Sequence, residues 1–174
     1  PGGVCLSTDF ATTWNVSNEG LPVAPACSVV LDPRSPRGQR TLYAAVFEHG
    51  VYKSADDGKT WTKKSKGLGS ASNLRVCRVA VHKDGALFAL VTGKRSSIGG
   101  PFIQEGAGLY RSRDAGENWE CITASNPLHW PKDFTVHPDD SNFIFVGAAN
   151  AGNSRGGLYR TQNGGQSWQR VADK

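Results

Sequence analysis

The chain has 174 residues, of which 38% are hydrophobic and 20% are charged, a composition that fits a globular protein with a core of its own. Its 21 glycines follow no three-residue period, which excludes collagen, and no apolar stretch approaches the roughly 20 residues that span a membrane. The Lys and Arg residues behind the net charge of +5 are scattered along the chain, so we expect no nucleic-acid partner.

Short β-rich runs follow one another along the chain, bounded by Gly, Pro, Asp and Asn. Residues 1–17 hold two such runs, and the segments 18–65, 66–124 and 125–174 hold four each. Runs of this length and spacing predict β-strands, and a unit of four strands matches one blade of a β-propeller. We therefore predict an all-β fold, a propeller segment of about three and a half four-stranded blades that leaves the ring incomplete.

One octet recurs in every unit, with the form Ser/Thr-x-Asp/Asn-x-Gly-x-x-Trp. Its tryptophans are 47, 58 and 49 residues apart, and self-similarity at such a period indicates one supersecondary unit per repeat. The first octet has Ala11 where the others have Gly. The residues that carry the pattern are Ser7, Asp9, Trp14, Ser54, Asp56, Gly58, Trp61, Ser112, Asp114, Gly116, Trp119, Thr161, Asn163, Gly165 and Trp168.

The residue types of the octet suit a tight turn between the third and fourth strands of a blade. The Asp can accept backbone N–H groups within its own turn, the Ser or Thr hydroxyl can add a further bond, and Gly supplies a positive φ. The Trp begins the returning strand, and we expect its ring to pack against the hairpin. We therefore assign these residues to architecture. His82 and His137 end the first strands of their blades, and we interpret them as strand-end residues rather than a catalytic or metal pair.

The four cysteines, Cys5, Cys27, Cys77 and Cys121, include no C-x-x-C pair. Zinc and thioredoxin-type chemistry therefore have no support, and we predict no metal site and no cofactor. Cys27 and Cys77 occupy matching positions in successive repeats, where we expect small buried apolar residues. The even count permits two disulfides, whose connectivity the sequence leaves open.

The N-terminus reads Pro-Gly-Gly, and the chain contains no Met. A secretion signal would begin with a basic segment followed by an apolar one, and neither is present. We therefore expect a mature product, an excised piece or the ordered part of something longer.

The octets resemble the Asp-box, also called the BNR repeat, of sialidases, sortilin-type receptors and xyloglucan-cleaving glycosidases. The blades look most like those of bacterial Asp-box proteins related to xyloglucan-active endoglucanases, over nearly the whole chain. This resemblance implies a propeller with a glycan groove and an extracellular or periplasmic location. If the chain is an enzyme, it implies a glycoside hydrolase, in which Phe47 stands where the family has a catalytic Asp and Glu48 is adjacent.

Binding is expected on the loops opposite the octets, because loops carry function while the scaffold positions them. The loop from 93 to 107 is too elaborate for a plain hairpin, and Trp130 lies outside every octet. Trp130 either stacks on a sugar or fills the gap between blades. The candidate ligand-binding residues are Trp130, His129, Phe102, Arg155 and His49, and the candidate catalytic carboxylates are Glu48 and Glu105.

Three functions are open at this point. In the first, the chain is a binding or scaffold module of a secreted protein that holds a glycan through its loop face. In the second, it is part of a glycoside hydrolase whose catalytic carboxylates are completed by missing blades. In the third, it is the peptide-binding propeller of an assembly factor or a receptor. An open arc would leave blade faces exposed. We therefore expect the remaining blades, in the same protein or in a second copy, as partners.

Overall fold

The computed structural model describes residues 3–103, 105–128, 130–151 and 155–171. Within these ranges all regular elements are β-strands, and none of the described segments forms a helix that could cross a membrane. The predicted all-β class is confirmed.

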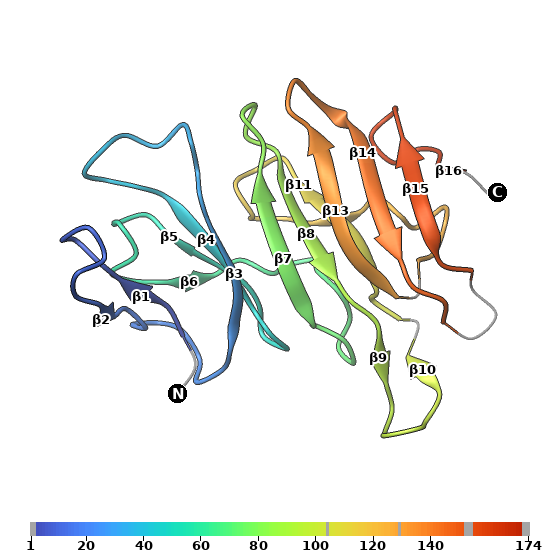
Figure 1. Ribbon diagram of the computed structural model, residues 1–174, viewed down its shortest axis with the longest axis horizontal. Helices are drawn as coiled ribbons and strands as arrows, with labels where there is room; N and C mark the ends of the chain where they lie inside the picture. Colours follow the sequence, from blue (N-terminus) through green and yellow to red (C-terminus); the bar gives the residue numbers. More distant parts are fainter. Residues whose placement is uncertain (1–2, 104, 129, 152–154, 172–174) are drawn as a thin grey trace.

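Three four-stranded antiparallel sheets make up most of the structure, each built from strands that follow one another along the chain. Figure 1 shows them side by side, in the order of the sequence. The first sheet holds β3 (Ala26–Leu31), β4 (Leu42–Val46), β5 (Gly50–Ser54) and β6 (Thr62–Lys63). The second holds β7 (Val76–Val81), β8 (Leu87–Val91), β11 (Gly108–Ser112) and β12 (Glu120–Cys121). The third holds β13 (Pro131–His137), β14 (Asp140–Ala148), β15 (Gly157–Thr161) and β16 (Gln169–Val171).

Two short antiparallel pairs accompany the sheets. The pair of β1 (Cys5–Leu6) and β2 (Asn15–Val16) flanks the first octet and corresponds to the outer half of a blade. The pair of β9 (Lys94–Arg95) and β10 (Phe102–Ile103) projects from the second sheet (Figure 1). The insertion that lengthens this repeat therefore folds as a ribbon of its own. Together these elements form a segment of a β-propeller with an incomplete ring, as the sequence predicted.

The core lies between the sheets, because the middle strands are buried on both faces. All five residues of β8 are fully buried, and successive side chains of a strand point to opposite faces. Leu87 and Ala89 pack toward the first sheet, while Phe88 and Leu90 pack toward the third. A further cluster joins the first sheet to the segment around β1 and β2. Burial on both faces explains why β8 is apolar without alternation.

The inner strands β3, β7 and β13 each carry a register shift close to their start, at Cys27, Cys77 and Lys132. The expectation that the two cysteines are buried is wrong, since Cys27 is exposed and Cys77 is only half-buried. A bulged residue leaves the alternation of its strand, so the apolar pattern does not fix which way it faces. Cys5 is exposed and Cys121 is half-buried, and all four thiols are free.

Candidate functional site

Each octet is a turn whose hydrogen bonds are satisfied internally. In the second octet, Ser54 Oγ donates to Asp56 Oδ1 at 2.7 Å and accepts the Gly58 N–H at 2.9 Å. Asp56 accepts the N–H and the hydroxyl of Thr60 at 3.0 and 2.6 Å. The same pattern recurs in the other octets. In the third, the Asn118 amide donates in place of the hydroxyl, and in the fourth the Asn163 amide donates to Ser167 Oγ. The hydrogen bonds from Thr60, followed by the one from Ser54, lower the pKa of Asp56 to about 2. Its carboxylate is therefore engaged in holding the turn.

The octet tryptophans join each blade to the preceding one. Their indole N–H groups donate to backbone carbonyls three residues after the preceding octet Trp, at 2.8 to 3.0 Å: Trp61 to Ser17, Trp119 to Lys64 and Trp168 to Ile122. Sequence reasoning placed these rings against their own hairpins and missed the bond across blades. Trp14 of the first octet is 61% exposed and has no hydrogen-bond partner among the described residues.

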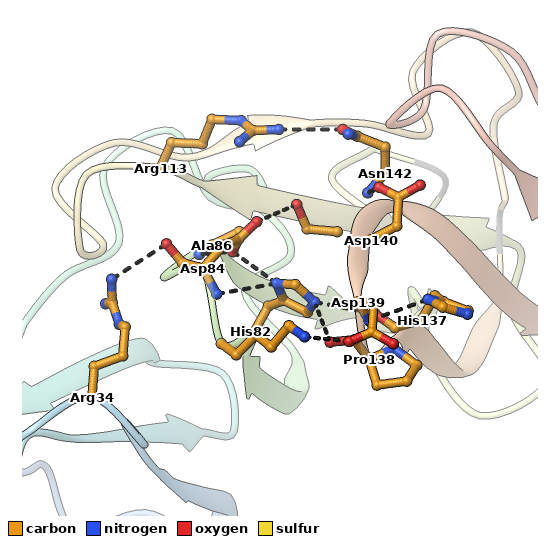
Figure 2. Close-up of polar contacts among 12 residues, drawn as sticks. Arg34, His82, Asp84, Ala86, Arg113, His137, Pro138, Asp139, Asp140 and Asn142 are labelled. Carbon is orange, nitrogen blue, oxygen red and sulfur yellow. Dashed lines mark hydrogen bonds and ion pairs between the residues drawn. The ribbon is translucent and has the colours of Figure 1, made fainter.

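A polar cluster lies at the turns that follow β7 and β13 (Figure 2). His82 is 8% exposed, and its Nε2 lies 3.1 Å from the carbonyl oxygens of both His137 and Pro138. Its Nδ1 lies 2.8 Å from Asp84 Oδ1, and Ser141 Oγ donates to Asp84 Oδ2 at 2.6 Å. The serine hydroxyl therefore meets the carboxylate and not the imidazole. The arrangement lacks the nucleophile–base contact that covalent catalysis requires.

This cluster braces successive blades. Arg34, in the turn after β3, donates to the Asp84 carbonyl at 3.4 Å (Figure 2), so the turns of all three sheets are linked. Although burial of the carboxyl opposes the effect, the hydrogen bonds from Ser141 and from the Ala86 N–H lower the pKa of Asp84 to about 2. We therefore assign the cluster to stability.

The candidate ligand site lies at the opposite end of the sheets, beside the β9–β10 ribbon. A cavity of about 520 Å³ opens there, and we call it the loop-face cavity. Its lining comes from loops far apart in the sequence: Glu48 from the β4–β5 turn, Arg75 from the segment before β7, residues 93–98 and Phe102 from the insertion, and Trp130 from the segment before β13. Three residues singled out from the sequence, Glu48, Phe102 and Trp130, thus meet in one place.

An ion pair forms one side of the cavity. Arg75 Nε donates to Glu48 Oε1 at 2.8 Å, and Lys94 Nζ lies 4.0 Å from the same oxygen. The hydrogen bond from Arg75 is the main cause that lowers the pKa of Glu48. Glu48 has a φ of 63° at the tip of the β4–β5 turn, and this tight turn aims its side chain toward the ribbon.

An aromatic pair forms another side. The rings of Phe102 and Trp130 have centroids 5.0 Å apart and planes inclined by 56°, an arrangement typical of attractive aromatic pairs. The Arg95 guanidinium lies over the Phe102 ring at 4.0 Å, and Lys132 Nζ lies over the Trp130 ring at 3.7 Å. Each ring thus carries a cation, within the distance at which cation–π attraction acts.

The other residues predicted for the site fall outside the lining. Glu105 is exposed and accepts a hydrogen bond from Ser72 Oγ at 3.2 Å. His49 is half-buried, and Arg155 is exposed, its carbonyl accepting the Tyr159 hydroxyl at 2.7 Å. His129 lies outside the described residues.

Sequence reasoning missed three cationic lining residues, Arg75, Lys94 and Arg95. The dipeptide Lys94-Arg95 opens the insertion, so its position inside the candidate loop was the available signal. Among the described residues no group of three or more His, Cys, Asp or Glu is placed to hold a metal ion. Because the lining combines aromatic rings with cationic donors, serine hydroxyls and one carboxylate, the cavity suits a small polar ligand or a segment of a polymer.

Fold and octets together define an Asp-box β-propeller. Residues 49–174 match the family described as Sortilin-Vps10 (Sortilin, neurotensin receptor 3), and the chain belongs to this family. No curated protein matches the chain.

Several solved structures share the fold. The GH74 enzyme of Niastella koreensis has a TM-score of 0.74 and 26% identity, with 97% of this chain aligned to 26% of that chain. The GH74 xyloglucanase of Xanthomonas campestris has a TM-score of 0.71 and 20% identity, over 98% of this chain and 27% of that one. YCF48 from Cyanidioschyzon merolae has a TM-score of 0.57 and 19% identity, over 90% and 40%. This chain thus spans about a quarter of the GH74 chains and less than half of YCF48.

Proposed function

We propose that the chain is a ligand-binding part of an Asp-box propeller and that it holds a glycan in the loop-face cavity. The observation that carries the proposal is the convergence of Glu48, Phe102 and Trp130, from three separate loops, on one cavity of about 520 Å³. Pockets of roughly 300–1,000 Å³ with aromatic walls and a few polar groups are the usual form of small-ligand sites.

The aromatic pair is the part of the cavity that fits a sugar. A pyranose ring presents C–H groups that pack on an aromatic face, and Trp130 is half-buried, so one part of its ring is available. Lys132, which lies over this ring, is exposed. A long exposed Lys side chain changes conformation at little cost, so a sugar ring can take its place over Trp130.

A peptide is the second candidate ligand. The family match carries the description of a neurotensin receptor, and one structural neighbour is YCF48 bound to D1 peptide, with a TM-score of 0.58 and 18% identity over 97% of this chain and 46% of that one. That neighbour supports the fold alone, whereas the aromatic pair favours a sugar. We therefore place the glycan first.

Glycoside hydrolysis is not favoured by the geometry. A glycosidase needs two carboxyl groups that flank one bond, and its general acid needs a raised pKa. Glu48 is the carboxylate among the lining residues, Glu105 is not part of the lining, and the Arg75 hydrogen bond lowers the pKa of Glu48. The site is therefore proposed for binding.

Further blades are proposed as the structural partners, in the same protein or in a second copy. The exposed indole of Trp14 supports this proposal, since the other three octet tryptophans each donate to a preceding blade. An extracellular or periplasmic location is also proposed, supported by the likeness to glycan-cleaving propellers. Fractionation of the source cells, with an antibody to this chain, tests the location.

Binding of the 174-residue chain to an array of plant and bacterial oligosaccharides tests the function. We expect binding to a subset of glycans, and we expect Trp130→Ala to abolish it because the aromatic wall is lost. Phe10→Ala is the matched control, because Phe10 is a fully exposed aromatic residue on an octet turn, away from the cavity. The proposal would be refuted if the Trp130→Ala variant still bound glycans, or if the parent chain bound none of them.

A further inference from the structure

The charges around the loop-face cavity are unequal. Three cationic side chains, those of Arg75, Lys94 and Arg95, line it together with one carboxylate, that of Glu48. Lys132, over the Trp130 ring, adds a cation at the margin. The cavity is thus the meeting point of four positive charges and one negative charge, in a chain whose basic residues are otherwise scattered.

Glu48 compensates only part of this charge. It accepts the hydrogen bond from Arg75 Nε at 2.8 Å and lies 4.0 Å from Lys94 Nζ. Lys94 Nζ also donates a hydrogen bond to a neutral acceptor, the Ser72 carbonyl, at 3.2 Å. Arg95 and Lys132 make no ion pair with any described residue. At least two cations therefore remain free to meet an anion.

The position of Arg95 is built by the ribbon. Arg95 pairs with Phe102 across the two strands, its guanidinium lies over that ring at 4.0 Å, and its Nη1 donates to the Gly100 carbonyl at 2.8 Å. The ring contact and the backbone bond orient the guanidinium, and its other N–H groups make no hydrogen bond with the described residues. An oriented guanidinium with free donors is the usual partner of a carboxylate, which it binds through two parallel hydrogen bonds.

We infer that the glycan bound in the loop-face cavity is acidic, a saccharide that carries uronate carboxylates. The carboxylate pairs with Arg95, and the pyranose ring that bears it packs on Trp130, from which Lys132 moves to a second acidic group. This inference rests on the proposed function and narrows it, because a neutral glycan would leave Arg95 and Lys132 without counter-charge.

Isothermal titration of the chain with tetragalacturonate and with its fully methyl-esterified form tests the inference, since the two share linkage and ring configuration and differ in the charge of their carboxyl groups. We expect tetragalacturonate to bind at least about tenfold more tightly, as hydrogen bonds between charged groups predict, and its affinity to fall with added salt. Arg95→Gln is expected to weaken tetragalacturonate binding about tenfold and to leave binding of the methyl ester unchanged.

Arg113→Gln is the matched control, because Arg113 is an exposed cation on an octet turn and its loss changes the net charge equally. It should leave both affinities unchanged. If Arg95→Gln disturbs the ribbon, Lys132→Gln makes the same test from outside β9 and β10. Equal affinities for the two tetrasaccharides, with binding still dependent on Trp130, would overturn the inference and leave the proposed function standing. Failure of both to bind, on a chain shown to be folded, would count against both.

Discussion

The contact between Gly67 and Trp119 offers a direct test of how the blades are joined. Gly67 lies in the connection from the first sheet to the second, with a φ of 83°, and a Cβ added there would lie 2.4 Å from the Trp119 carbonyl oxygen. The adjacent Lys66 carbonyl accepts a hydrogen bond from the backbone N–H of Trp119 at 2.9 Å. Gly67→Ala therefore both strains the backbone and separates the connection from the outer strand.

Gly38 supplies a matched control, because its φ is also 83° while a Cβ there would meet nothing within 4 Å. We expect Gly38→Ala to lower the free energy of unfolding by ~1–2 kcal/mol, the cost of a side chain in the left-handed region. Gly67→Ala bears the same cost plus overpacking of about 1–3 kcal/mol. Urea unfolding followed by Trp fluorescence measures both variants. Equal losses in the two variants would refute the claim that this close approach holds the blades together.

Four further outcomes are expected. Trp119→Phe should lower the free energy of unfolding by about 1 kcal/mol or more, because the bond to the Lys64 carbonyl is lost; an unchanged urea midpoint would contradict the role of the indole N–H. The pKa of Asp56 is about 2 in the folded chain against an ordinary 3.8. Its contribution to stability is therefore complete above pH 3.8 and is lost as the pH falls toward 2. Acid titration followed by circular dichroism should show a smaller loss of stability in Asp56→Asn than in the parent chain. Burial raises the pKa of the Cys77 thiol to about 11, so iodoacetamide at pH 8 should modify Cys77 slowly in the folded chain and rapidly in urea, as read by mass spectrometry. Glu48→Gln removes the one carboxylate from the cavity lining and should raise the affinity for tetragalacturonate; weaker binding would place Glu48 on the ligand.

The octets and the strand order could be predicted because their determinants lie close together in the chain. The bonds among Ser54, Asp56 and Thr60 span six positions along the sequence. Each sheet takes its strands in chain order, with the β9–β10 ribbon inserted between β8 and β11 of the second sheet. The bulges could not be predicted in the same way. Cys27 and Cys77 sit at matching places in two repeats, and only the pairing register shows that they leave the alternation of their strands.

The candidate site also has parts that local sequence could predict and parts that depend on tertiary contacts. Phe102 and Trp130 were recognisable as aromatic residues in loops, but their 5.0 Å approach depends on how the second and third sheets are placed. Arg75 had no local signal, and it belongs to the site because the β4–β5 turn brings Glu48 to it. Glu105 was a candidate carboxylate in a loop, as Glu48 was, yet its side chain binds Ser72 outside the lining.

The sequence by itself determined the repeating unit. A turn that satisfies its own hydrogen bonds, and a strand that pairs with one close to it in the chain, need only local information. The tertiary structure decided which loops share a cavity, which face of each indole meets a neighbour, and which charges remain uncompensated. These depend on the rotation from one sheet to the next, which is set by close packing of side chains such as Phe88 and Phe134 between sheets. That packing is a property of contacts between residues far apart in the chain, and it therefore emerges only when the blades are assembled.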